Sequence, residues 1–384
     1  MLGTKGGTIG LGFVEASSQY TLLYSDLSSV LLWGVNELKK KYKGGDTMNT
    51  MKSKHLLILL LSLFVFCFSS TVFANKAQDE AIDYLKQAVE NTANAKNLTY
   101  KINLSMTSPL ADGDIIVDGK YSELMNTSGN MNISFNSWID TIKFEATTQF
   151  YTEITDNNLN QYLKMKTTPL INDINPDQWY ISSTTLADNA NELFSQKKQF
   201  NLDKFTQNIT NIFMYDVNKN TAKIYVTYTR PILDEGMKAE LKTLYAKDDK
   251  QKQNLEKLDN LLAKNPQLVE SLAKPRKISY ELTIDKKSQS ITNLKTDFSN
   301  NIQEFGNEVL DSIPDEEFSD VNGYVLRNTF KNYLNLSKFN LNIRISHLNN
   351  TTVDEIPQEV KTSALPLPET DLPQPTQTTL LSKL

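Results

Sequence analysis

The sequence predicts an α+β fold in which an antiparallel sheet packs against amphipathic helices. From Tyr100 onward, apolar and polar residues alternate with a period of two in successive runs, which is typical of half-buried strands. The connections between these runs are short and polar, so antiparallel pairing of neighbours is favoured over helical crossovers. Two other stretches, residues 76–97 and 233–273, repeat apolar residues at helical spacing.

The N-terminal half of this pattern predicts one helix followed by a series of strands. The helix is expected over residues 76–97, because Ala81, Leu85 and Val89 share one face. Acidic residues cluster near its start, where the helix dipole favours negative charge. The strands are expected at residues 100–106, 114–124, 131–135, 142–150 and 161–167, and from Trp179 onward.

The C-terminal half predicts helices placed between further strands. A strand ends at Pro231, because proline cannot donate to a central ladder. Strands are expected at residues 222–228, 277–284, 290–298 and 339–348. Helices are expected at residues 187–199, from Asn201 to Phe213, across the insertion 233–273 and at 302–310, with a part-helical insertion up to Tyr333.

Residues 51–74 have the layout of a secretory signal peptide. Lys52 and Lys54 precede an apolar core, and Ala74 closes a Val-x-Ala step, so cleavage after Ala74 is predicted. Retention as an anchor is the alternative, but the uninterrupted apolar core is shorter than the roughly 20 residues of a spanning helix. We expect the remaining chain to be exported from a bacterium, extracellular or associated with the envelope, without stable membrane insertion.

Three further segments complete the predicted organisation. Residues 1–47 precede the signal peptide, and we interpret them as a leader from upstream coding sequence, with translation starting at Met48 or Met51. Residues 75–360 form a single domain that carries the helical insertion. Residues 361–384 are rich in proline and poor in large side chains, so this tail is expected to be disordered.

The charge of the exported part excludes some partners. The whole chain has 40 Lys and Arg against 45 Asp and Glu. Residues 1–74 contain seven lysines and four acids, so their removal leaves 33 cations against 41 acids, a net charge of −8. An acidic body of this kind argues against nucleic acid and against electrostatic adhesion to anionic lipid.

The sequence offers no metal centre, cofactor site or catalytic residue. Cys67 is the only cysteine and leaves with the signal peptide, and His347 is then the only histidine, in a run typical of a strand surface. A zinc site would lack nitrogen ligands, and no nucleophile elbow or phosphate-binding loop is present in the exported part. We therefore expect a protein that is not an enzyme.

A glycan hydrolase with paired carboxylates is the less favoured alternative. Such catalysis needs two carboxyl groups that face each other across a cleft. The acids that could be nominated are neighbours along polar segments, which are usually solvated faces. They are Asp248, Asp249, Asp315, Glu316 and Glu317.

Over residues 76–360 the chain resembles the LolA-like and LppX-like families of bacterial extracytoplasmic proteins. The matching features are the first helix leading into Leu98-Thr99-Tyr100, Gln161–Met165 followed by Pro176–Tyr180, the hairpin at 284–287 and Val353–Pro357. The resemblance implies an open half-barrel, a curved antiparallel sheet whose concave face is covered by helices and holds acyl chains. The chain departs from these families in having no lipobox and in its long charged helical insertion.

Two functions follow from these expectations. The first is a secreted carrier or sensor that holds a lipid or other hydrophobic molecule between sheet and helices. The second is an envelope scaffold or protein-interaction module with a filled core. For the carrier, the side chains expected to line the ligand are Phe144, Phe150, Tyr162, Leu163, Trp179 and Tyr180.

Overall fold

The structure, a computed structural model, describes a folded region that begins at the first predicted helix. The predicted leader, the signal peptide, the helix at 187–199 and the acids at 315–317 lie outside the described residues. The described residues are 76–122, 126–137, 143–155, 158–170, 174–185, 206, 208–232, 239, 242, 249–263, 265–312 and 323–368.

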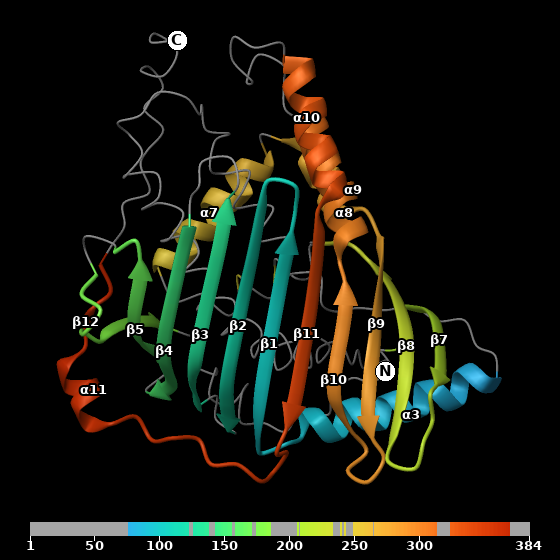
Figure 1. The fold of residues 1–384 in the computed structure, drawn as a ribbon, viewed down its shortest axis with the longest axis horizontal. Helices are drawn as coiled ribbons and strands as arrows, with labels where there is room; N and C mark the ends of the chain where they lie inside the picture. Colours follow the sequence, from blue (N-terminus) through green and yellow to red (C-terminus); the bar gives the residue numbers. More distant parts are fainter. Residues whose placement is uncertain are drawn as a thin grey trace, which may run out of the picture.

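A single large, curved and unclosed sheet of twelve strands forms the centre of the molecule (Figure 1). Its strand order is β12-β6-β5-β4-β3-β2-β1-β11-β10-β9-β8-β7, and every pairing except that of β12 with β6 is antiparallel. The strands are β1 (Asn97–Thr107), β2 (Ala111–Ser122), β3 (Asn126–Ser137), β4 (Lys143–Thr155), β5 (Asn158–Thr168), β6 (Tyr180–Thr185), β7 (Ile209–Tyr215), β8 (Thr221–Arg230), β9 (Arg276–Asp285), β10 (Ser290–Asp297), β11 (Lys338–Ser346) and β12 (Leu365–Pro366).

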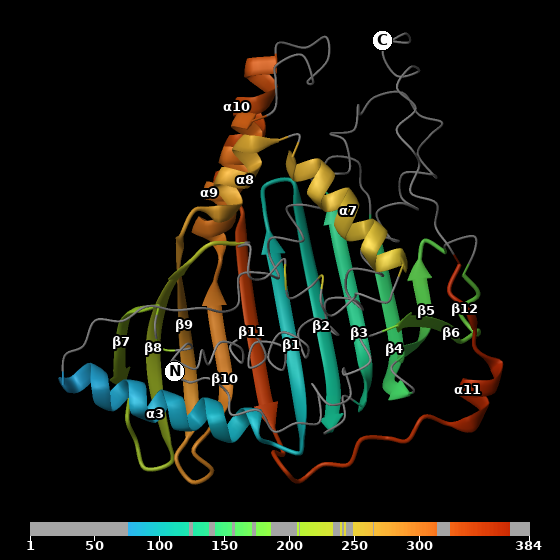
Figure 2. The ribbon, with the colours of Figure 1, turned by 180° about the vertical axis from the view of Figure 1, so that it is seen from behind.

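Helices cover one face of this sheet. Helix α3 lies across β7 to β10, and α7 crosses the same face above the other half of the sheet (Figure 2). Helices α8, α9 and α10 gather at the end of the sheet where β9 and β11 begin (Figure 1). The bounds are α3 (Lys76–Ala93), α7 (Asp249–Ala263), α8 (Pro266–Ala273), α9 (Ser299–Ser312), α10 (Gly323–Leu336) and α11 (Gln358–Ser363). The predicted α+β fold with a curved antiparallel sheet and helices on one face is therefore confirmed.

The helix-covered face of the sheet, which we call the concave face, is apolar from one side of the molecule to the other. Strand register aligns one residue from each of ten strands into a continuous row, because side chains directly opposite each other share a face. From β5 to β7 this row is Met165, Thr148, Met131, Val117, Ile102, Ile343, Leu294, Leu282, Ile224 and Met214.

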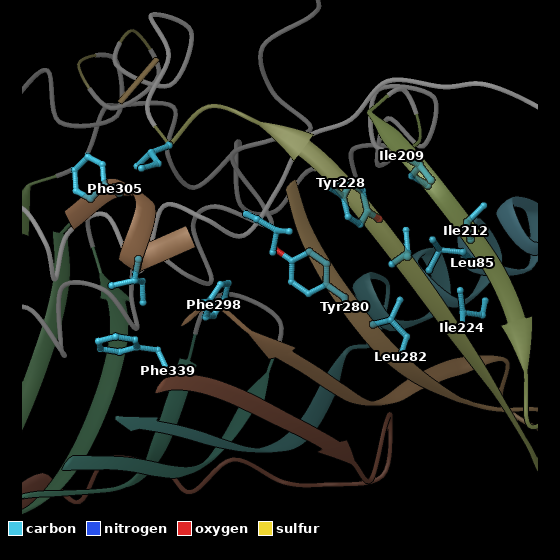
Figure 3. Packing of buried hydrophobic residues seen from close by; sticks show 14 of the residues in the cluster. Leu85, Ile209, Ile212, Ile224, Tyr228, Tyr280, Leu282, Phe298, Phe305 and Phe339 are labelled. Carbon is cyan, nitrogen blue, oxygen red and sulfur yellow. The ribbon is translucent and has the colours of Figure 1, made fainter. Parts of the chain in front are cut away.

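The buried residues of the concave face form two clusters. The first lies under α3, where Leu85 packs among residues of β7 to β9 such as Ile212 and Ile224 (Figure 3). Within it, the rings of Tyr228 and Tyr280 meet edge to face with their centroids 5.6 Å apart. The second cluster lies on β1 to β6, and no described helix contributes a buried side chain to it.

Two glycines on the second cluster lie where neighbouring groups approach the strand closely. Gly119 is opposite Tyr100, and a Cβ atom at Gly119 would lie 2.4 Å from the Tyr100 ring and hydroxyl. Gly129 is the next residue of the same row, and Phe150 lies over it from β4. Glycine is therefore required at Gly119 by the Tyr100 ring, and at Gly129 by the backbone of β2 at Asp118 and Gly119 as well as by the Phe150 ring.

The C-terminal part of one predicted helix is a strand in the structure, whereas residues 201–205 and 207 lie outside the described residues. Residues 201–213 have apolar residues at helical spacing, but Ile209–Tyr215 forms β7 at the edge of the sheet. A β-bulge between Ile209 and Asn211 inserts one extra residue, so Ile209 and Ile212 both face the core although they are three residues apart. The bulge therefore reproduces helical spacing inside a strand.

The ends of two predicted segments also differ. Helix α3 ends at Ala93, and Asn97 begins β1 instead of closing the helix. The tail expected to be disordered from residue 361 is folded as far as Pro368. Its β12 pairs with β6 through the N–H groups of Leu365 and Leu367. Pro366 lies between them and has no N–H group, but the ladder needs no donor at that position.

Candidate functional site

A patch of half-buried apolar side chains lies on the concave face where the two buried clusters meet. These residues come from the ends of β1, β2, β3 and β11 that lie nearest α10. Leu341 and Leu294 pack against both clusters, which places this region at their boundary. We call the patch the junction patch; it consists of Leu104, Met106, Ile115, Phe135 and Leu341.

Register makes the junction patch continuous. Leu104 lies opposite both Leu341 on β11 and Ile115 on β2. Met106 and Phe135 flank Gly113 from the two neighbouring strands. A Cβ atom on Gly113 would meet these two side chains at 3.8 and 3.5 Å, which is ordinary contact. The glycine therefore leaves room above the strand that a larger residue could occupy.

Helix α7 crosses the sheet on the side of the junction patch (Figure 2). Among the described elements, α8 is the one that α7 contacts extensively, and no strand is in comparably close contact with it. Leu262, near the end of α7, is buried in the first cluster. Helix α7 is thus held from its C-terminal end by α8, and its described backbone lies in close contact with none of the described strands to the same extent.

Polar groups on the concave face are few and uncharged near the junction patch. Thr296 lies opposite Leu341 and is buried, and its hydroxyl has no hydrogen-bond partner in the described part of the chain. Thr148 in the ten-strand row is also buried, and its hydroxyl likewise has no hydrogen-bond partner in the described part of the chain. A hydrophobic site with one or two polar groups of this kind can hold an apolar chain and orient a polar atom of it.

The predicted lining residues are divided between the two faces of the sheet. Phe144, Phe150, Leu163 and Tyr180 are buried together in the second cluster on the concave face. Phe144 pairs directly with Phe135 of the junction patch. The structure therefore brings four of the six residues to one side and places one of them next to the patch.

Tyr162 and Trp179 lie on the opposite face. Tyr162 is paired with Tyr151, whose ring centroid is 5.5 Å from that of Trp179. The Tyr162 hydroxyl donates to Glu153 at 3.2 Å, and Lys361 of α11 binds the same carboxylate at 2.6 Å. Burial, together with the neighbouring Glu153 carboxylate, raises the pKa of Tyr162 to about 12. Tyr162 therefore shares the Glu153 carboxylate with Lys361 of α11, and neither Tyr162 nor Trp179 faces the junction patch.

Known proteins give little further information about the site. No family model and no curated protein matches the chain. LprF from Mycobacterium bovis is similar at 10% identity and a TM-score of 0.32, with 72% of this chain and 97% of LprF covered. A β-barrel-like protein of the domain of unknown function DUF1849 from Brucella abortus is similar at 9% identity and a TM-score of 0.20, with coverages of 53% and 86%. Because both TM-scores are below 0.5, neither similarity assigns a family or a function.

The described residues lack both a metal-binding cluster and a helix that could span a membrane. They hold no group of three or more His, Cys, Asp or Glu side chains that could bind a metal ion. No helix among them is both long enough and apolar enough to cross a bilayer.

The residues of the junction patch were not distinguished by the sequence. Leu104, Met106 and Phe135 alternate with polar residues as any half-buried strand does, and Ile115 belongs to an apolar run that continues to Val117. What separates them from the buried core is their position between the two clusters, which depends on the pairing of β1 with β11. The only local signal is Gly113, a glycine inside a strand, which often marks a close approach or an open space.

Proposed function

We propose that the protein is an exported, non-enzymatic carrier or sensor that binds a lipid or another hydrophobic molecule at the junction patch. The observation that carries this proposal is the half-burial of five apolar side chains on the concave face where the two buried clusters meet. Apolar area that remains in contact with water loses about 25 cal/mol per Å² of stabilisation. A hydrophobic ligand that covers these side chains would recover it.

The surroundings of the patch favour an apolar chain with a small uncharged polar group. The patch residues carry no charge, and the unpaired hydroxyl beside them belongs to Thr296. A fatty-acyl ester or a similar molecule would place its hydrocarbon on Leu104 and Ile115 and its carbonyl oxygen near that hydroxyl. This arrangement supports a neutral lipid more than a free carboxylate, because a buried charge needs a partner.

The test fills the patch and measures ligand uptake. We expect Gly113→Leu to place a side chain against Met106 and Phe135 and to lower the affinity for a fluorescent acyl ester by at least about tenfold. The matched control is Gly113→Ala, whose Cβ atom meets only ordinary contacts, and which should bind like the wild-type protein. Thermal unfolding of each variant separates loss of the site from loss of the fold.

Two results would reject the carrier. One is the absence of bound lipid, by mass spectrometry, from protein purified without delipidation, together with no uptake of the acyl ester. The other is equal uptake by Gly113→Leu and wild-type protein. The envelope scaffold would then be favoured, and the almost complete burial of Val117, Met131 and Leu163 in the second cluster supports that alternative.

A further inference from the structure

Helix α10 has its charged residues on the side that packs against the protein. Arg327 donates to the backbone carbonyl of Leu310 at 3.0 Å, and Lys331 forms an ion pair with Asp311 at 2.5 Å. Both acceptors lie near the end of α9. Farther along, Asn335 is held by Asn307 at 2.8 Å and by Gln303 at 3.1 Å. These polar contacts hold α10 on α9 together with Leu334, which packs against the first cluster.

The opposite side of α10 is uncharged and partly apolar. Val325 is 50% exposed and Leu336 is 65% exposed, at the two ends of one helical stripe. Thr329, Asn332 and Tyr333 lie between them at spacings of four, seven and eight residues from Val325, which places all of them on one side. Phe330, 37% exposed, flanks this stripe. We call the stripe from Val325 to Leu336 the outer stripe.

This placement of the two cations and of Val325, Phe330 and Leu336 differs from that expected for a helix that faces water. Surface helices normally bury their apolar stripe and turn their charged residues outward. In α10 the two cations are used to attach the helix to α9, and apolar side chains are left outside. An exposed surface without charges, which ends in a leucine and a valine, matches a partner that is apolar and not one that is recognised by its charge.

The size of the outer stripe argues for a lipid surface and against a second protein. A helix of 14 residues is about 21 Å long and about 10 Å wide, so one side offers roughly 200 Å². A stable protein–protein interface buries about 800 Å² on each partner. Side-on insertion of an amphipathic helix into the surface of a bilayer requires no matching shape and no comparable area.

The position of α10 connects this surface with the junction patch. Helix α10 projects beyond the end of the sheet (Figure 1) and ends at Leu336, two residues before β11 begins. The next apolar residues of the chain, Phe339 and Leu341, pair with Met106 and Leu104. The outer stripe therefore lies at the same end of the molecule as the patch proposed to bind a hydrophobic ligand.

We propose that α10 docks the protein on the surface of a lipid bilayer through its outer stripe. The biological purpose of the docking, transfer of a hydrophobic molecule to or from the junction patch, rests on the proposed function. The docking itself does not, because it depends only on the exposed side chains of α10. Since the outer stripe is uncharged, binding is expected to neutral lipid and to be insensitive to salt.

The experiment measures co-flotation of the protein with phosphatidylcholine vesicles at low and high salt. The chain from Asn75 onward is used, because it contains every described element and lacks the apolar segment 51–74, which would bind lipid itself. The test variant is Val325→Ser/Leu336→Ser. The control is Leu170→Ser/Val217→Ser, which removes two apolar side chains of similar exposure, 65% and 54%, outside α10.

We expect wild-type protein and the control to float at both salt concentrations, and the test variant to partition into vesicles at least about tenfold less. The test variant should still bind the acyl ester, whereas Gly113→Leu should still float, so failure of docking and failure of the carrier are distinguishable. Flotation that is absent from wild-type protein, equal in the test variant, or dependent on anionic lipid and low salt would overturn the proposal. A wild-type dimer in sedimentation that the test variant loses would also overturn it, and would assign the outer stripe to a second copy.

Discussion

At the scale of single residues, the packing of the second cluster depends on two glycines, which have no side chain, as well as on the aromatic rings above them. Tyr100 and Phe150 occupy space above Gly119 and Gly129 that a methyl group would fill. A glycine inside a strand is usually costly because it gives up packing and conformational entropy. Here the rings supply the packing, and the cost is offset.

We predict that Gly119→Ala destabilises the protein by about 1–3 kcal/mol, because overpacking forces a neighbouring ring out of its place. Gly113→Ala, on the same strand and the same face, should change the free energy of unfolding by less than about 1 kcal/mol. Chemical denaturation of the two variants and wild-type protein checks this comparison. Equal stability of the two variants would contradict the position of the Tyr100 ring.

At the scale of elements, the attachment of α8 and α9 to the sheet depends on Arg276 at the start of β9. Its side chain is fully buried and donates to Glu308 of α9 and to the backbone and hydroxyl oxygens of Ser271 in α8. Lys274 binds the same Glu308 carboxylate at 2.6 Å. One carboxylate therefore links two helices to the end of a strand.

This link makes part of the stability dependent on pH. Burial raises the pKa of Glu308, but hydrogen bonds from Arg276, Lys274 and Ser271 outweigh burial and hold that pKa below its ordinary value of 4.5. A carboxyl group with a lowered pKa in the folded state stabilises the fold above its unfolded pKa, and this contribution is lost as pH falls through the folded pKa. The relevant window is therefore below about pH 4.5.

We predict that Glu308→Gln lowers the free energy of unfolding by about 1–3 kcal/mol at neutral pH, the range of a hydrogen bond to a charged group. Below this pH window, the free energies of unfolding of the variant and of the wild-type protein should converge. Glu304→Gln is the control: its side chain is 61% exposed although it also contacts Arg276, so its effect should be within about 0.5 kcal/mol. Denaturation curves across the acidic range would contradict this account if both variants behaved alike.

At the scale of the whole molecule, β12 covers one edge of the sheet. Leu365 and Leu367 donate to Trp179 and Ile181 at 2.9 Å, and Gln178 donates to Ser363 at 2.6 Å. An uncovered edge strand presents unpaired backbone groups on which another strand can add. The tail therefore protects β6 in the described structure.

We predict that truncation after Val360 leaves a folded protein that associates through the exposed edge of β6. Light scattering should show dimers or larger species that are absent from the full chain at the same concentration. Truncation after Pro368 retains β12 and should remain like the full chain. Association of both truncated proteins, or of neither, would contradict a protective role for β12.

The alternating pattern was sufficient to predict the sheet and the helices, because periods of two and 3.6 are local properties of the chain. The pattern failed where the structure depends on pairing between distant parts of the chain. The bulge at Ile209 and Asn211 made β7 resemble a helix, and the pairing of β12 depends on a strand nearly two hundred residues earlier.

The candidate site was harder to predict than the fold, for the same reason. Tyr162 and Leu163 are consecutive and both buried, because β5 is covered on both faces. Alternation then gives no indication of which side chain faces the concave side. The exposure of the junction patch depends on where two clusters end, and no single strand encodes that boundary.

The boundary between the clusters has a mechanical consequence. In the described chain, Leu294 and Leu341 are the side chains that pack against both halves of the interior. Because few side chains join the two clusters, we expect the sheet to bend more easily at this boundary than within either cluster, with the strand registers unchanged. Such bending would change the curvature of the sheet at the junction patch itself, because Leu341 belongs to both.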